Sequence, residues 1–113
     1  MSNVNVHIIG SVKPNLYPAI NRVYKELINN LKIMDHDITK LTCVVPAEET
    51  NIKNLISNRF TLINGADIVI AVLKPDRTFG KGTLYEIEYA KRHHLIVYSA
   101  FVTETVVEYE KIE

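Results

Sequence analysis

The chain has 113 residues, of which 47% are hydrophobic and 23% are charged, and these values are typical of a folded domain. We expect a single domain over residues 1–113. Basic and acidic residues balance to a formal net charge of +0 at pH 7. This balance argues against a nucleic-acid-binding protein, because tracking phosphates requires an excess of lysine and arginine. It leaves a small anionic ligand open.

Cys43 is the only cysteine, so the chain cannot form an internal disulfide. Its apolar surroundings indicate a buried side chain rather than a nucleophile. No apolar run reaches the roughly 18 residues that cross a membrane. The first ten residues lack the basic region and the cleavage site of a secretory signal, so we expect a cytoplasmic protein.

The first half of the chain predicts two strands and two helices. Residues 4–10 are β-branched and apolar, which indicates a strand. Over 20–31, apolar residues recur three and four positions apart, which predicts an amphipathic helix. The apolar segment 41–45 predicts a second strand, and the apolar spacing over 52–63 predicts a second helix.

The second half continues the alternation. The strand at 66–73 is the clearest in the sequence, because nearly every residue is apolar, as in a parallel strand covered on both faces. A third helix begins near Gly82, residues 95–101 predict a fourth strand, and residues 103–113 predict a terminal helix. This order predicts an α/β fold of three layers, with a parallel sheet between helices, as in Rossmann-like and flavodoxin-like folds.

Ligands of such sheets bind outside the carboxyl ends of the strands, where two polar loops with glycine are expected. The first loop contains Gly10, the Ser11 hydroxyl and the Lys13 ammonium group. Together these groups can hold a phosphate or a sugar hydroxyl. An ordinary strand-to-helix connection also explains them.

The second loop runs from residue 74 to the third helix. Gly80 and Gly82 permit positive φ and close backbone approach, and the helix that follows has unpaired N–H groups and a positive dipole end. An anion can bind there, although an ordinary turn also explains the glycines. The four histidines form no H-x-x-x-H pair, so we expect no metal site.

Glu86 has two interpretations on the residues alone. Thr83 and Glu86 have the T-x-x-E spacing of a capping box, in which the glutamate folds back to the N–H of the cap residue. Alternatively, Glu86 faces the binding site as an ionised carboxylate at the carboxyl end of a strand.

The segment GADIVIAVLKPDRTFGKGTLYEIEYAKRHHLIVYSA, residues 65–100, resembles the nucleoside 2-deoxyribosyltransferase superfamily, which includes deoxyribonucleoside 5'-monophosphate N-glycosidases. The resemblance rests on an Ala-Asp pair before the strand and on the pattern G-T-x-x-E-x-x-x-A. In this chain the pattern is formed by Gly82, Thr83, Glu86 and Ala90. The segment HIIGSVK is similar to the first strand and substrate loop of the family.

The resemblance implies that Glu86 is the nucleophile at the anomeric carbon of a deoxyribosyl group, in a retaining transfer of the glycosidic bond. It also implies a nucleoside or nucleotide partner, a homo-oligomer of two or more copies, and no metal or organic cofactor. The charge balance and the apolar run lengths given above lead us to expect no nucleic-acid partner and no membrane. The implied substrate-binding residues are Gly10, Ser11, Lys13, Gly82 and Thr83.

The chain departs from the family pattern at three positions. Arg59 stands where the family usually has an aspartate that donates a proton or binds the base. Lys81 stands where an aspartate often precedes G-T, and Glu88 replaces a glycine. Asp76 is then a candidate acid and substrate contact from the loop, and Arg59 is a candidate phosphate contact.

Two hypotheses follow. The chain is an enzyme that cleaves or exchanges the N-glycosidic bond of deoxynucleosides or their monophosphates. The alternative is a catalytically silent nucleotide-binding or sensor protein on the same fold.

Overall fold

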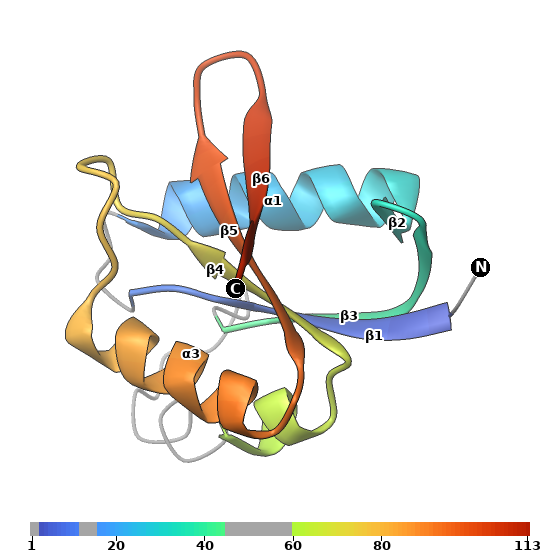
Figure 1. Cartoon of the computed structure of the whole chain (residues 1–113). Helices are drawn as coiled ribbons and strands as arrows, with labels where there is room; N and C mark the ends of the chain where they lie inside the picture. Colours follow the sequence, from blue (N-terminus) through green and yellow to red (C-terminus); the bar gives the residue numbers. More distant parts are fainter. Residues whose placement is uncertain (1–2, 12–15, 45–59) are drawn as a thin grey trace.

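The computed structural model describes residues 3–11, 16–44 and 60–113 (Figure 1). Its elements in chain order are β1 (Asn3–Ile9), α1 (Tyr17–Asn30), β2 (Lys32–Ile33), β3 (His36–Cys43), β4 (Ile68–Val72), α3 (Lys81–Arg92), β5 (Ile96–Val102) and β6 (Val107–Ile112). Residues 60–64 are also helical and lead into β4.

The strands form one sheet in the order β2-β3-β1-β4-β5-β6. The four central strands are parallel, while β2 and β6 are antiparallel to their neighbours at the two edges. Helix α1 covers one face of the sheet, and α3 with residues 60–64 covers the other (Figure 1). The predicted three-layer α/β fold is therefore confirmed, with an antiparallel strand added at each edge.

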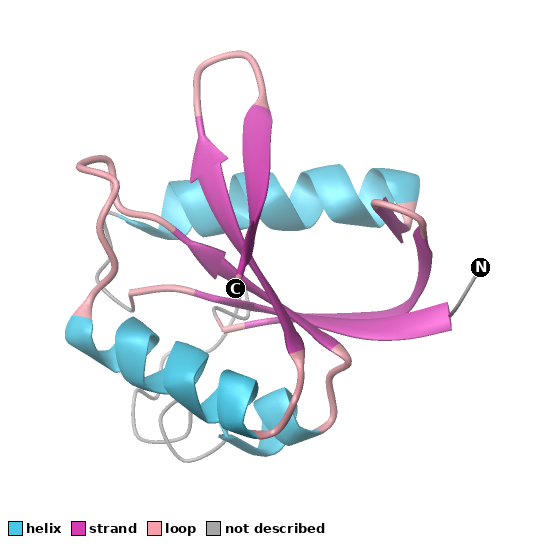
Figure 2. Ribbon diagram, in the orientation of Figure 1, coloured by secondary structure: helices cyan, strands magenta, loops and turns pink. Residues whose placement is uncertain are grey.

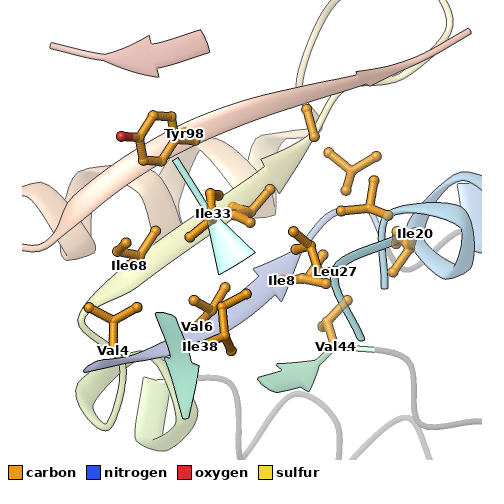
Figure 3. Packing of buried hydrophobic residues seen from close by; sticks show 14 of the residues in the cluster. Val4, Val6, Ile8, Ile20, Leu27, Ile33, Ile38, Val44, Ile68 and Tyr98 are labelled. Atoms are coloured by element: carbon orange, nitrogen blue, oxygen red, sulfur yellow. The ribbon is translucent and has the colours of Figure 1, made fainter. Parts of the chain in front are cut away.

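The side chains of β4 pack against helices on both faces of the sheet. All five are buried, and successive side chains of a strand point to opposite faces. Ile68, Ile70 and Val72 belong to the core beneath α1, whereas Val69 and Ala71 belong to the core beneath α3. Figure 3 shows the first of these cores, where side chains of β1, β4 and α1 meet.

Helix α1 forms where its apolar spacing predicts it. Ile20, Val23 and Leu27 lie on its buried face, and Pro18 occupies the first turn, where a missing N–H costs nothing. The helix ends at Leu31, whose φ of 52° is left-handed and whose N–H donates to the Leu27 carbonyl at 2.7 Å.

The predicted terminal helix at residues 103–113 is wrong. Those residues form a tight turn and then β6, which pairs with β5 along its whole length (Figure 2). The Thr103 hydroxyl closes the turn by accepting from the Val106 N–H at 3.0 Å and donating to the Val106 carbonyl at 2.8 Å. The edge of β5 supplies the backbone partners that make a strand more stable here than a helix.

Two other predictions differ from the structure. The strand predicted at 41–45 begins earlier, at His36, because β2 and β3 form a short hairpin through Met34 and Asp35. The second helix predicted at 52–63 lies mainly outside the described residues, and only its end at 60–63 is described, as helix.

Candidate functional site

The carboxyl ends of β1 and β4 form the natural ligand position of this sheet. The two strands are neighbours, but the chain leaves β1 toward β3 and leaves β4 toward β5, on the opposite side. The connecting helices, α1 and α3, lie on opposite faces. In open α/β sheets, ligands bind where successive connections diverge in this way. Residues 10–11 and the loop 73–80 follow these two strand ends.

The structure brings Ser11 together with the start of α3. A Cβ built on Gly80 would lie 3.7 Å from the Ser11 Oγ and 4.0 Å from the Thr83 Oγ1. A side chain at position 80 would therefore fill the space between the two hydroxyl groups. Two of the predicted site residues, from segments far apart in the sequence, are thus placed around one glycine.

Gly10 acts through close approach rather than through an unusual backbone angle. All four glycines lie in the described residues, and none has a positive φ. A Cβ on Gly10 would come within 2.9 Å of the Ile20 Cδ1 and 3.3 Å of the Leu16 Cδ2. Gly10 thus lets α1 pack closely against the end of β1. Gly82 is exposed in the first turn of α3.

Glu86 points into the protein from the buried face of α3. It is 0% exposed, and the other buried residues of the helix are Thr83, Ile87 and Ala90. The last two pack on the sheet in the core beneath α3. Because α3 starts at the carboxyl ends of the strands, Thr83 and Glu86 lie nearer to that edge than Ile87 and Ala90.

Of the two interpretations of Glu86, the capping box does not form. The N-cap of α3 is Gly80, so Thr83 is already three residues inside the helix and Glu86 lies almost two turns from its start. No side chain in the described ranges caps this helix end. The first N–H groups of α3 are therefore open to a ligand, water or another acceptor.

The Thr83 side chain carries a buried hydroxyl group at the start of α3. The side chain is buried, and its Oγ1 has no hydrogen-bond partner among residues 3–11, 16–44 and 60–113. A buried hydroxyl usually has a hydrogen-bond partner, because burying it without one costs about 1–3 kcal/mol. The Thr83 hydroxyl is thus available to a bound molecule.

Asp76 lies in an exposed turn of the loop after β4. Its Oδ1 accepts hydrogen bonds from the Thr78 hydroxyl at 2.6 Å and the Thr78 N–H at 3.0 Å. These bonds hold the pKa of Asp76 below its usual value. The ionised form is the favoured one in this conformation, where its oxygen closes the turn.

Arg77, in the same loop, contacts side chains of β5 and β6. Its guanidinium carbon lies 4.0 Å from the centre of the Phe101 ring, and its Nη2 lies 3.8 Å from the Glu108 Oε1. Its φ of 65° is in the left-handed region. The hairpin of β5 and β6 thus helps to set the path of the loop that leads to α3.

Of four residues singled out by the family resemblance, two are not described and two lie away from the ligand position. Lys13 and Arg59 lie outside the described residues. Lys81 and Glu88 are exposed and line a hollow on the outer face of α3, turned away from the sheet. The positive charge that Lys81 would add is therefore on the outer side of the helix.

His7 is a buried polar residue that the sequence analysis missed as a candidate. It is 0% exposed in β1, and its Nδ1 lies 2.7 Å from the Thr42 Oγ1. Burial lowers the pKa of His7 to about 4, so the ring is neutral near pH 7. Its Nε2 has no partner within the part of the chain that is described. A histidine between the apolar residues Val6 and Ile8 was the available signal.

Neither a membrane span nor a metal cluster is found in the described residues. None of the helices there has both the length and the apolar character to cross a membrane. No three His, Cys, Asp or Glu side chains in those ranges are grouped closely enough to hold a metal ion.

Comparison with known proteins gives a match in fold. No protein-family model and no curated protein matches this chain. The fold is similar to that of a 2-desoxiribosyltransferase from Leishmania mexicana. The two structures superpose with a TM-score of 0.58 at 19% sequence identity, over 91% of this chain and 66% of that chain. This chain thus spans just under two thirds of that protein's length, and at this identity the likeness establishes the fold.

Proposed function

We propose that this chain transfers or hydrolyses the N-glycosidic bond of 2'-deoxynucleosides or their 5'-monophosphates, with Glu86 as the nucleophile. The observation that carries the proposal is a fully buried carboxylate beside the ligand position of the sheet. Glutamate is rarely fully buried, so one that lies at such a position is a candidate for chemistry. The structural likeness to a 2-desoxiribosyltransferase supports the same reaction class.

The reaction has two steps at the anomeric carbon. A Glu86 carboxylate oxygen bonds to C1' as the bond from C1' to the base nitrogen breaks, and the base leaves with the electron pair and takes up a proton. Water or the nitrogen of a second base then attacks C1' and releases Glu86. A sugar without a 2'-hydroxyl suits this chemistry, because no electron-withdrawing group opposes the positive charge that develops at C1'.

The other site residues are assigned to substrate binding. The Ser11 and Thr83 hydroxyls flank Gly80 and can bond to sugar or phosphate oxygens. The open N–H groups at the start of α3, including that of Gly82, favour an anion such as a 5'-phosphate. Gly10 shapes the opposite wall by letting α1 pack closely.

Two cations complete the proposed substrate contacts. Lys13 and Arg59 are proposed as partners of a 5'-phosphate, from the resemblance and their charge. Both lie outside the described residues.

The leaving base requires a proton donor. Asp76 is the candidate from the loop, but its carboxylate accepts two hydrogen bonds from Thr78 and its pKa is lowered. A carboxyl group in that state does not hold a proton to give to the leaving base near neutral pH. Asp76 would have to leave the turn when the substrate binds.

This same observation favours a second candidate function. If Asp76 stays in its turn, the chain binds nucleotides without cleaving them and acts as a silent binding or sensor protein. Both functions use the same ligand position and the same hydroxyl groups.

The test is the release of free base from a panel of 2'-deoxynucleosides and their 5'-monophosphates, with and without an acceptor base, followed by chromatography. We expect Glu86→Gln to lower kcat by on the order of 10³-fold or more, because the amide cannot form the covalent bond. Mass spectrometry of the quenched wild type should find a deoxyribosyl group on Glu86.

Glu104→Gln is the matched control, because Glu104 is exposed in the turn between β5 and β6. It should leave the rate unchanged. Base release that survives Glu86→Gln would sink the nucleophile assignment. Nucleotide binding at micromolar concentration without any base release would favour the sensor function instead.

A further inference from the structure

Arg77 lies at the corner of the turn that Asp76 and Thr78 form in the loop after β4. The turn is closed by two backbone hydrogen bonds of 2.9 Å, from the Lys74 N–H to the Thr78 carbonyl and from the Arg77 N–H to the Lys74 carbonyl. The hydrogen bond from the Thr78 N–H to the Asp76 Oδ1 spans Arg77, so it depends on the backbone angles of this residue. The conformation of Arg77 therefore controls whether Asp76 stays bonded to Thr78.

The backbone conformation of Arg77 is unfavourable for an arginine. Its φ of 65° lies in the left-handed region, where the Cβ of a residue other than glycine crowds the following carbonyl oxygen. If Arg77 relaxed to a negative φ, the Thr78 N–H would turn away from Asp76. We therefore expect contacts outside the turn to hold Arg77 in place.

Two such contacts are made to a pair of residues that face each other in the β5–β6 hairpin. Phe101 and Glu108 are partners in the antiparallel pairing of these strands. The Arg77 guanidinium carbon lies 4.0 Å from the centre of the Phe101 ring, and its Nη2 lies 3.8 Å from the Glu108 Oε1. The ring attracts the guanidinium through its π electrons, and the carboxylate attracts it through its charge. We call these two contacts the Arg77 latch.

The Arg77 latch is weak enough to open. The Arg77 and Glu108 side chains are 63% and 54% exposed, so water and salt screen the ion pair. An exposed cation–π contact is likewise weak, and the left-handed backbone of Arg77 opposes both contacts. The closed and open turns are therefore close in free energy, and a bound ligand can shift the balance between them.

Opening of the turn changes what Asp76 can do at the ligand position. In the closed turn both hydrogen bonds from Thr78, together with the charge of Lys74, hold the pKa of Asp76 below its usual value. In the open turn the bonds from Thr78 are lost, and the carboxyl oxygens become available to a ligand. The same loop ends at Gly80, beside Ser11, so a ligand bound there lies against the loop that carries the latch.

We propose that Arg77 is a positioning residue: its latch to the β5–β6 hairpin holds Asp76 against Thr78, and the Asp76 carboxyl group reaches the ligand only when the latch opens. The use of Asp76 in bond cleavage rests on the proposed function. The latch itself does not, because its opening is measured without a substrate.

Hydrogen exchange of the Thr78 amide, followed by nuclear magnetic resonance, measures how often the turn opens. Arg77→Asn removes both contacts of the latch and keeps a residue type that tolerates a positive φ. It should speed this exchange about tenfold, and Glu108→Gln about threefold, because exposed cation–π and ion-pair contacts are each worth a small factor. Glu110→Gln is the matched control, since Glu110 is also an exposed glutamate of β6, and it should exchange as the wild type does.

Titration of the Asp76 carboxyl carbon tests whether the latch acts on Asp76. Phe101→Leu removes the aromatic ring and changes no charge, so any shift reports the turn itself. The midpoint for Asp76 should move up toward the usual value of an aspartate, because the bonds from Thr78 that favour the ionised form are made less often. A residue with only a structural role in the hairpin would leave this midpoint unchanged.

Base release from 2'-deoxynucleoside 5'-monophosphates tests the use of Asp76. In Arg77→Asn, kcat should rise by about the same factor as the exchange rate, because the open turn is populated more often. KM should stay within about twofold of the wild type, because the hydroxyl groups that bind the substrate are unchanged. The rise in kcat should disappear when Asp76→Asn is added.

Each result bears on a separate part of the proposal. Thr78 exchange in Arg77→Asn that is no faster than in Glu110→Gln would overturn the latch, as would an unchanged Asp76 midpoint in Phe101→Leu. Faster exchange with an unchanged kcat would overturn the role of Asp76 in cleavage. Faster exchange without base release from either protein would support the latch and contradict the proposed function instead.

Discussion

The three-residue spacing of Thr83 and Glu86 is compatible with two local structures. They lie three residues apart, a distance that suits a capping box and also places both side chains on one face of a helix. The structure starts α3 at Gly80, three residues before Thr83, so the shared face turns inward rather than to the helix end. The carboxylate is therefore buried beside the ligand position instead of closing the helix.

The Thr83 hydroxyl gives a prediction at this scale. Thr83→Val keeps the shape of the side chain and removes a buried oxygen that has no partner in the described residues. We expect the free energy of unfolding to stay equal or to rise by about 1 kcal/mol in urea titrations, because no hydrogen bond is lost. Binding of a 2'-deoxynucleoside 5'-monophosphate, measured by calorimetry, should weaken about tenfold.

Thr103→Val is the matched comparison, since the Thr103 hydroxyl makes two hydrogen bonds to Val106. It should lower the free energy of unfolding by about 1 kcal/mol and leave nucleotide binding unchanged. A loss of stability in Thr83→Val as large as in Thr103→Val would mean that Thr83 has a structural partner.

At the scale of elements, the secondary structure of β6 is determined by the strand beside it. Its side chains alternate in burial, with Val107 and Tyr109 half buried between exposed glutamates. The alternation is short, and the many glutamates suit a helix equally well by propensity. The open edge of β5 and a hydrogen bond to α1 are the features that select the strand.

Tyr109 joins β6 to α1 and gives a prediction for this contact. Its hydroxyl donates to the Glu26 Oε2 at 2.6 Å, and burial together with Glu26 raises the pKa of Tyr109 well above its usual value, so it stays a donor. Tyr109→Phe should lower the free energy of unfolding by about 1–2 kcal/mol in urea titrations. Glu26→Gln keeps an acceptor and should cost less. An unchanged stability in Tyr109→Phe would show that the bond does not hold β6.

At the scale of the whole molecule, His7 makes stability depend on pH. The unfolded chain takes up a proton on His7 near pH 6.5, whereas the folded chain takes it up only near pH 4, because burial lowers the pKa. Between these values the unfolded state binds more protons, so stability falls as the pH falls. The loss reaches about 3 kcal/mol below pH 4.

Urea unfolding at several pH values checks this dependence. His7→Gln should lose less stability than the wild type between about pH 6.5 and about pH 4, and His94→Gln, at an exposed position, should follow the wild type. A His7→Gln curve parallel to the wild type would contradict the prediction. Nuclear magnetic resonance of the imidazole provides a direct reading, with the folded ring expected to titrate near pH 4 rather than near pH 6.5.

Much of this fold could be predicted from hydrophobic periodicity. The strands β1, β4 and β5 and the helices α1 and α3 have apolar patterns that persist whatever their neighbours are. Their alternation predicted a three-layer fold, with a sheet between two layers of helices, and a ligand position at the carboxyl ends of the strands. Because the third predicted helix follows the carboxyl end of a strand, the alternation also predicted that Glu86 lies near that edge of the sheet.

The sequence by itself thus determined which segments bury apolar faces, because burial depends on the local spacing of side chains. Only the tertiary structure decided how these faces meet. Strand order, the edge strand β6, the nearness of Ser11 to Gly80 and the inward direction of Glu86 all depend on residues far apart in the chain. Such contacts are selected by backbone pairing and by packing in three dimensions, and no local pattern encodes them.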